Sequence, residues 1–242
     1  MTEYALLNNV AHQDLKVITE RSARYGDDVM YCMTFPFEFR SVQASYPILM
    51  QQDSNGSLYP VALLGFQEKE NLFLGESGWK TNYVPAMIRR EPFVVGFQNS
   101  SKEGEDKTTR MLSIDMAHPR VSIDAGEPLF QPLGGRTPFL ESSADLLETI
   151  YVGTEHVRGF MAALKEYGLT EAITIEIPLI DGSRNQLIGF HGLVEEKIQE
   201  LDGATLESFS RNGYLMPLFM MLASFVNIQK LVELKNETVG KQ

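Results

Sequence analysis

Short apolar segments separated by turn residues occupy the first half of the chain. Apolar runs at residues 46–50 and 59–66 flank the turn Ser54–Ser57, whose Asn-Gly pair tolerates the positive φ angles of a hairpin turn. We therefore predict an antiparallel hairpin here. A short helix over residues 36–44 should precede it, and a third short strand over residues 70–74 should follow it.

A second hairpin is predicted further along the first half. Phe93–Phe97 and Met111–Asp115 are its expected arms, because both are apolar and rich in strand-forming residues. The connecting residues 99–107 are charged and contain no apolar side chain, which is typical of a solvated loop. Residues 119–136 then contain three prolines and three glycines, which makes this segment the candidate place for a subdivision of the chain.

The second half of the chain shows helical periodicity. Apolar residues recur at spacings of three and four between Thr137 and Gly168, which places them on one face of a helix of about twenty-eight residues. Thr137 is the expected N-cap, Pro138 fits the first turn, and Gly168 is the expected stop. The predicted buried face consists of Leu140, Ala144, Leu147, Tyr151, Thr154, Val157, Met161 and Leu164.

A last hairpin and further helices complete the pattern. Ile173–Ile177 alternates branched apolar with polar residues, and the Asp181-Gly182 turn leads into residues 185–190. Helices are expected at residues 195–201, 205–211 and 215–237. This order of elements predicts an α+β fold with antiparallel hairpins, a long central helix and a helical C-terminal part. We expect a single domain over residues 1–242, with a candidate subdivision near residues 119–136.

Acidic residues outnumber basic ones in this chain. Its 242 residues carry 32 Asp and Glu against 21 Lys and Arg, which gives a formal net charge of −11 and a pI near 4.9. Because no dense run of Lys or Arg interrupts this charge, binding to nucleic acid or to an anionic membrane surface is not expected. The longest apolar run, Tyr214–Val226, contains Pro217 and is too short for a bilayer span, so a core helix is expected. The N-terminus shows no secretory signal, and we expect a cytoplasmic protein.

Motifs that would define a common enzyme class are absent from the sequence. There is no Gly-x-x-x-x-Gly-Lys-Ser/Thr loop, no Gly-x-Gly-x-x-Gly after a strand and no Gly-x-Ser-x-Gly elbow. The only cysteine, Cys32, lies between apolar residues, which favours a buried inert thiol over a nucleophile. The four histidines are not spaced like the ligands of a two-histidine, one-carboxylate iron site. They are His12, His118, His156 and His191. The sequence therefore favours a non-enzymatic protein and indicates neither a metal site nor a cofactor.

The segment from residue 79 to residue 93 has the richest chemistry. It contains the only tryptophan, a tyrosine and two consecutive arginines. Guanidinium groups bind carboxylates or phosphates in a bidentate fork, and aromatic rings can line a ligand. The candidate ligand site is therefore Trp79, Tyr83, Arg89 and Arg90, in which an arginine binds an anion and the two rings form the wall. The alternative is structural: the arginines anchor a turn, one pairing with a buried carboxylate and the other capping helix carbonyls.

This segment, together with others in the same order along the chain, resembles the SapC family, which is named for a protein encoded alongside bacterial surface-layer components. The matching residues are Glu38-Phe39, Tyr46-Pro47-Ile48, Pro60–Gly65, Asn71-Leu72-Phe73, Trp79, Tyr83–Ala86, Arg89-Arg90, Pro92-Phe93 and Gly213-Tyr214-Leu215. The resemblance covers roughly residues 10–232. Glu91 departs from the family, which often has an aromatic or other residue at this position.

The resemblance implies a bacterial accessory protein. Family members also resemble accessory proteins encoded near outer-membrane uptake receptors and tryptophan-halogenase-like enzymes. The resemblance implies no particular activity and no catalytic residue for this chain. Our leading hypothesis is a cytoplasmic accessory protein that binds another protein or a small anionic ligand. One alternative is a metal-dependent oxygenase-type enzyme that works with such neighbours. Another is a surface-layer-associated structural protein.

An apolar, methionine-rich segment near the C-terminus offers a surface for self-association. It contains Phe219, Met220, Met221 and Phe225, and methionine-rich faces can form adaptable interfaces. A homodimer is therefore one expectation, and burial of these side chains in the core of a monomer is the other.

Overall fold

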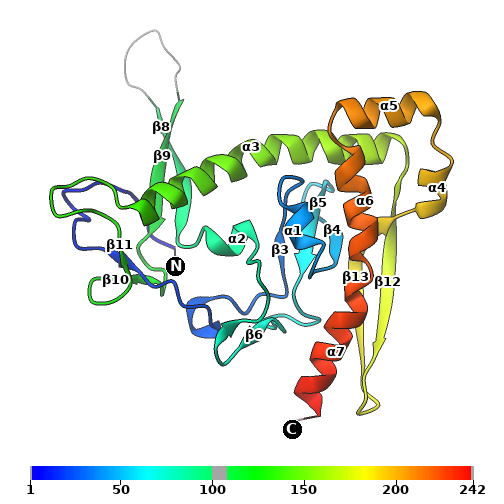
Figure 1. The fold of residues 1–242 in the computed structure, drawn as a ribbon, viewed down its shortest axis with the longest axis horizontal. Helices are drawn as coiled ribbons and strands as arrows, with labels where there is room; N and C mark the ends of the chain where they lie inside the picture. Colours follow the sequence, from blue (N-terminus) through cyan, green and yellow to red (C-terminus); the bar gives the residue numbers. More distant parts are fainter. Residues whose placement is uncertain (1, 100–107, 241–242) are drawn as a thin grey trace. The chain divides into compact units, whose positions relative to one another are not determined.

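The computed structural model describes residues 2–99 and 108–240 (Figure 1). These residues form two compact units, each built from two stretches of the chain. Unit 1 comprises Met1–Asp27 and Ala86–Val152, and unit 2 comprises Asp28–Pro85 and Gly153–Gln242. The segment 119–136 lies within unit 1, and the single-domain expectation stays a prediction. The charged loop predicted over residues 99–107 falls almost entirely outside the described residues.

Unit 1 is built around a three-stranded antiparallel sheet. Its elements are β1 (Tyr4–Leu6), β2 (Lys16–Val17), the 3-10 helix η1 (Ala23–Tyr25), α2 (Ala86–Arg89), β8 (Phe93–Asn99), β9 (Thr108–Asp115), β10 (Val121–Ser122), β11 (Glu127–Pro128) and the part of α3 (Pro138–Glu166) that ends at Val152. The strand order of the sheet is β1-β9-β8, and a second small sheet has the order β10-β2-β11. The β8–β9 pair is the second predicted hairpin, with Phe93 opposite Ile114.

One face of this sheet packs against helix α3. Phe93 and Ile114 are buried there with Leu140 and Leu147 from the helix. The helix begins as predicted, because the Thr137 hydroxyl oxygen accepts a hydrogen bond from the Leu140 N–H at 3.3 Å. The 29 residues of α3 also agree with the predicted length and periodicity.

A buried ion pair fixes the loops of unit 1. Arg120 is only 1% exposed, and its Nη2 lies 2.6 Å from Oδ2 of the buried Asp27. The other terminal nitrogen of Arg120 donates to the carbonyl oxygens of Ile18 and Glu20. Because this guanidinium joins the segment 18–27 to residue 120, about a hundred positions later, we assign it a structural role.

Unit 2 contains a five-stranded antiparallel sheet in the order β12-β13-β4-β5-β3. Its elements are β3 (Tyr31–Met33), α1 (Phe39–Val42), β4 (Ile48–Gln52), β5 (Leu58–Leu63), β6 (Leu74–Gly75), β7 (Gly78–Trp79), the rest of α3, β12 (Thr170–Pro178), β13 (Arg184–Leu193), α4 (Glu195–Gln199), α5 (Gly203–Arg211), α6 (Leu215–Ser224) and α7 (Asn227–Val239). The first and last predicted hairpins are β4–β5 and β12–β13. The fold is therefore mixed α+β, as predicted, with antiparallel sheets, a long helix and a helical C-terminal segment.

The two hairpins of this sheet meet at a single point. In the β12–β13 hairpin, Ile173 lies opposite Phe190 whereas Ile175 lies opposite Leu187, so β13 contains one extra residue. Gly189 takes up this bulge with a φ of 83°, a conformation that glycine adopts without a steric penalty. Beyond the bulge, β13 pairs with β4 only through His191 and Met50.

The predicted third strand differs from the observed structure. Residues 70–74 were expected to be extended, but the Asn71 side-chain oxygen accepts a hydrogen bond from the Phe73 N–H at 3.0 Å and forms a turn. The strand therefore starts only at Leu74, where β6 pairs with β7 across a tight turn.

The C-terminal helix also differs from the prediction, because it is interrupted at Phe225 and Val226. The Ser224 hydroxyl donates to the Met221 carbonyl oxygen at 2.6 Å, a local bond that competes with regular helix geometry. By length and composition alone, the segment Leu215–Val239 is apolar enough to cross a membrane. Only one third of its most apolar window is buried in the structure.

Candidate functional site

The two aromatic residues of the predicted site belong to a hydrogen-bonded network in unit 2. The Trp79 indole N–H donates to the Tyr46 hydroxyl oxygen at 2.7 Å, and the Tyr46 hydroxyl donates to the Tyr83 carbonyl oxygen. The Tyr83 hydroxyl donates to the buried Glu38 carboxylate at 2.7 Å, which also accepts from the Thr34 hydroxyl. Burial raises the pKa of Tyr46, so this hydroxyl remains a donor. The polar atoms of both predicted rings are therefore used within unit 2.

The two arginines of the predicted site lie in unit 1, at the end of α2. Arg90 donates to the Phe93 carbonyl oxygen and forms an ion pair of 2.9 Å with Glu91. Arg89 is exposed. Because the two aromatic residues belong to unit 2 and the two arginines to unit 1, the assignment of all four to one ligand site stays a prediction.

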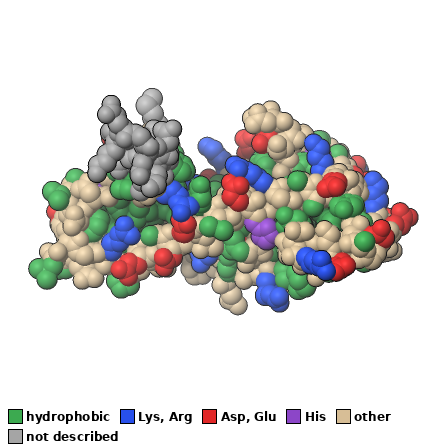
Figure 2. All heavy atoms as spheres, turned by 90° about the horizontal axis from the view of Figure 1, so that it is seen from above, with side chains coloured by type: hydrophobic (Ala, Val, Ile, Leu, Met, Phe, Trp, Pro, Cys, Tyr) green, Lys and Arg blue, Asp and Glu red, His purple; other side chains and the backbone are tan. Residues whose placement is uncertain are grey.

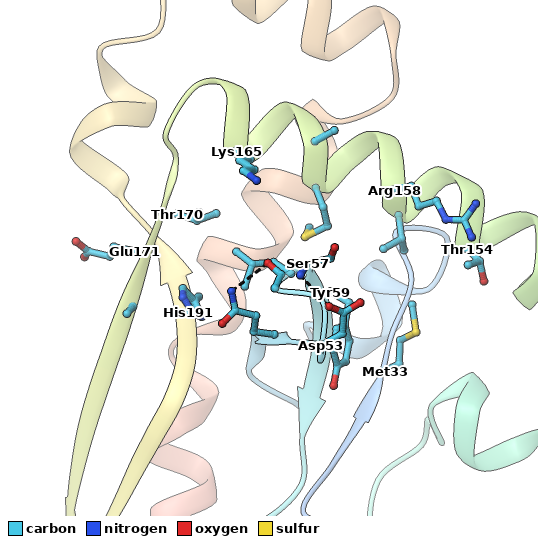
Figure 3. A pocket seen from close by; sticks show the side chains of 17 residues that line it. Met33, Asp53, Ser57, Tyr59, Thr154, Arg158, Lys165, Thr170, Glu171 and His191 are labelled. Atoms are coloured by element: carbon cyan, nitrogen blue, oxygen red, sulfur yellow. Dashed lines mark hydrogen bonds between the residues drawn. The ribbon is translucent and has the colours of Figure 1, made fainter.

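A large cleft lies elsewhere in unit 2, with a volume of about 930 Å3 (Figure 3). One face of helix α3, between Thr154 and Lys165, forms one side of the cleft. The β4–β5 hairpin contributes Gln52, Asp53 and Gly56–Tyr59. The start of β12 and His191 of β13 line the remaining wall. The volume is in the upper part of the range of 300–1,000 Å3 that is usual for small-molecule sites.

Helix α3 supplies the cations of this cleft. Arg158 and Lys165 are seven residues apart and therefore project from the same face of the helix. Arg158 is exposed and forms an ion pair of 2.7 Å with Glu155, one turn earlier. Within the described part of the chain, Lys165 has no ion-pair partner. Both cations lie on the helix side of the cleft, with Arg158 extended toward Thr154 and Lys165 nearer the other end (Figure 3).

Two carboxylates are also among the lining residues of the cleft, but they differ in whether they already accept hydrogen bonds from the chain. One oxygen of Asp53 accepts the backbone N–H groups of Asn55 and Ser57, so this carboxylate holds the hairpin turn together. Glu171 is exposed on β12. The cleft thus has cations on the helix side, whereas the exposed carboxylate of Glu171 points away from the other lining side chains (Figure 3).

His191 lies in the cleft at the point where the two hairpins of the sheet meet. Its Nδ1 is buried, and no hydrogen-bond partner for it is present among residues 2–99 and 108–240. Buried polar atoms usually have such a partner, which a ligand or a water molecule could provide here. In the same described residues, no cluster of three or more His, Cys, Asp or Glu side chains is arranged to hold a metal ion.

Apolar side chains form the base of the cleft. Val157 and Met161 of α3 are buried, and Met33 and Leu58 come from the sheet. Tyr59 adds a hydroxyl whose pKa is raised by burial and by the neighbouring Tyr31. An apolar base with a few polar groups around it is typical of a site for an amphipathic small molecule.

Sequence reasoning identified only part of this cleft. It recognised the face of α3 with Thr154, Val157 and Met161 as apolar, and it named His191 among four histidines. It missed Arg158 and Lys165, although their spacing of seven on a predicted helix was a usable signal. Charged side chains at this spacing normally face solvent, and only the tertiary structure brings the hairpin opposite them.

Basic and acidic side chains are interspersed on the face of the molecule drawn in Figure 2, without a single large basic patch on that face.

Fold and site together define an α+β protein with a ligand-sized cleft between a helix and a sheet. The family model named SapC matches residues 7–231, and the chain belongs to the SapC family. Neither a curated protein nor a solved structure matches the chain.

Proposed function

We propose that this SapC-family protein is a non-enzymatic accessory protein that binds an amphipathic small molecule carrying an anionic group. The observation that carries the proposal is the cleft of about 930 Å3 in unit 2, because it combines an apolar base with two cations on one helix face. We place the ligand in this cleft and not beside Trp79 and Tyr83, because the polar atoms of those two side chains form hydrogen bonds within unit 2.

The charge distribution supports an anionic ligand group. An anion placed between Arg158 and Lys165 would gain charge-assisted hydrogen bonds, which contribute more than neutral ones. Glu155 already orients Arg158, and that exposed pair is easily rearranged because surface ion pairs contribute little free energy.

The apolar base supports a ligand with a hydrocarbon or aromatic body. Val157 and Met161 would cover such a body from the helix side, and Met33 and Leu58 would cover it from the sheet side. Methionine side chains adapt to different shapes, which suits a site that accepts several related ligands. The buried Nδ1 of His191 would gain a hydrogen-bond partner from the ligand or from a water molecule bound with it.

Two fluorescent probes that differ in one charged group test this proposal. Anilinonaphthalene sulfonate has an aromatic body and a sulfonate, and N-phenyl-1-naphthylamine has the same body without the charge. We expect both probes to bind, and we expect the double variant R158E/K165E to weaken the sulfonate probe by about tenfold or more. Binding of the uncharged probe should change little.

The matched control is R211E/K230E. Both residues are exposed in unit 2 outside the cleft, and Arg211 pairs with Glu207 much as Arg158 pairs with Glu155. This control makes the same change in net charge, so it should leave the affinity for both probes close to that of the wild type. Equal weakening of the sulfonate probe in both double variants, or binding that neither variant changes, would contradict an anion site in the cleft.

We also propose that the protein acts inside the cell. The support is chemical: burial raises the pKa of its single thiol, Cys32, and a buried unpaired thiol suits a reducing compartment. Cell fractionation with an antibody against the native chain tests this, and recovery in the surface or outer-membrane fraction would contradict it.

A further inference from the structure

Helix α6 and the turn after it present an apolar stripe to solvent. Leu215, Phe219, Leu222 and Val226 recur along the chain at spacings of four, three and four. Phe219 is 49% exposed and Val226 is 74% exposed, and Met216, beside the stripe, is 55% exposed. Alternating spacings of three and four are those of a seam that packs against another helix.

This stripe contains no charge to bury. Between Arg211 and Lys230 the sequence has no Asp, Glu, Lys or Arg. A second surface could therefore cover the stripe without the desolvation penalty that buried charges incur. An apolar patch of this kind is common where a protein meets a partner.

The opposite side of α6 is fixed to unit 2. Leu218 and Met221 are buried. The Ser224 hydroxyl oxygen accepts the Ile48 N–H at 2.8 Å, and the Asn227 side-chain amide donates to the Gln43 carbonyl oxygen at 2.7 Å. Because spanning a bilayer would break these contacts, the stripe is better suited to docking than to insertion.

A hollow adjoins the stripe. It has a volume of about 200 Å3 and lies between Met221, Leu222 and Phe225 of the helical segment and Leu49 and Leu193 of the sheet. An apolar cavity of about 150 Å3 is sufficient to admit a benzene molecule. The hollow, which Glu195 also lines, is therefore large enough for a phenylalanine ring.

We propose that two copies of this chain associate through α6 across a two-fold axis, with Phe219 of each copy placed in the hollow of the other. A two-fold interface uses the same surface twice, so that surface must carry both the projecting group and the matching recess. The α6 surface carries both. A membrane surface is disfavoured as the occupant, because the chain has a net charge of −11 and Glu195 lies at the hollow.

Sedimentation velocity of the full chain over a range of concentrations tests the dimer. We expect a reversible dimer in the wild type and a dissociation constant at least about tenfold weaker in F219E, because the carboxylate would be desolvated in the hollow. The matched control is L133E, since Leu133 is fully exposed in unit 1 and has no part in the stripe. It should dimerise like the wild type.

Circular dichroism melts separate this loss from unfolding. Phe219 is half exposed, so F219E should melt close to the wild type. A wild type that stays monomeric at every concentration would overturn the proposal, as would equal dimerisation of wild type and F219E. Flotation of the wild type, but not of F219E, with phosphatidylcholine and phosphatidylglycerol vesicles would also overturn it, in favour of a membrane partner.

Discussion

His118 shows how the charges of unit 1 influence one another. Its Nδ1 accepts a hydrogen bond from the Arg120 N–H at 3.2 Å, and its Nε2 lies 3.7 Å from Glu91. Burial is the main factor that lowers the pKa of His118, and the positive charge of Arg120 lowers it further, against opposing effects from Asp115 and Asp27. Folding of unit 1 therefore favours the neutral form of the His118 imidazole over the protonated form.

This shift predicts the pH dependence of stability in unit 1. A histidine in the unfolded chain takes up a proton near pH 6.5, whereas folded His118 does so only at lower pH. Between these two pH values the unfolded state therefore binds more protons than the folded state. The His118 contribution to stability is therefore complete above about pH 6.5 and is lost as the pH falls through its lowered pKa. Urea unfolding at a series of pH values measures this loss.

The variant H118N isolates the effect. Its side-chain oxygen can still accept the Arg120 N–H, but it cannot take up a proton in this range. We expect a smaller fall in the free energy of unfolding between neutral pH and pH 5 than in the wild type. Identical slopes for the two proteins would show that His118 does not titrate as proposed.

At the scale of elements, the bulge in β13 depends on one glycine. Gly189 has a φ of 83° in open surroundings, so an added methyl group would meet no neighbour but would force an unfavourable backbone conformation. We expect Gly189→Ala to destabilise the fold by roughly 1–2 kcal/mol in chemical denaturation.

Gly203 provides the control for this prediction. It lies at the start of α5, also in open surroundings, but without a positive φ. Gly203→Ala should be neutral or slightly stabilising, because alanine is the better helix former. If both variants lost the same stability, backbone strain at Gly189 would not be the cause.

The sequence predicted local elements well and their partners poorly. Thr137, Pro138 and the apolar spacing along α3 are local signals, and they located the helix correctly. The pairing of His191 with Met50 depends on two segments that are distant in sequence, so no local pattern identifies it. The break after Ser224 was also missed. The Ser224 hydroxyl bonds locally to Met221, but it also accepts the Ile48 N–H of β4, a contact that no local pattern shows.

The same limit applies to the candidate site. Trp79 and Tyr83 were predicted as ligand residues from their chemistry alone. The sequence does not show that their polar atoms bond to Tyr46 and Glu38, which precede them by more than thirty positions. Arg158 and Lys165 looked like ordinary surface charges of a helix. They line a cleft only because the β4–β5 hairpin lies opposite them.

At the scale of the whole molecule, the net charge of −11 opposes association of two copies. The α6 stripe is uncharged, and of the residues that the structure describes, Glu195 is the one charged residue that lines the hollow. No ion pair is proposed across the interface, so salt should screen the repulsion between the copies without weakening the contact itself. The Debye length falls from about 30 Å at 0.01 M salt to about 8 Å at 0.15 M. We therefore expect the dimer dissociation constant to decrease several-fold over this range in sedimentation experiments, and an increase would indicate an interface held by ion pairs.

The way unit 2 is divided along the chain also determines when it can form during synthesis. Its β3, β4 and β5 strands leave the ribosome early. The hydrogen bond from the Ile48 N–H to the Ser224 hydroxyl can form only after Ser224, which follows 176 positions later, has been synthesised. Until then the growing chain exposes apolar strand surface that α6 will later cover. A nascent chain truncated before residue 215 should therefore be a preferred client of molecular chaperones, whereas the full-length chain should be released from them.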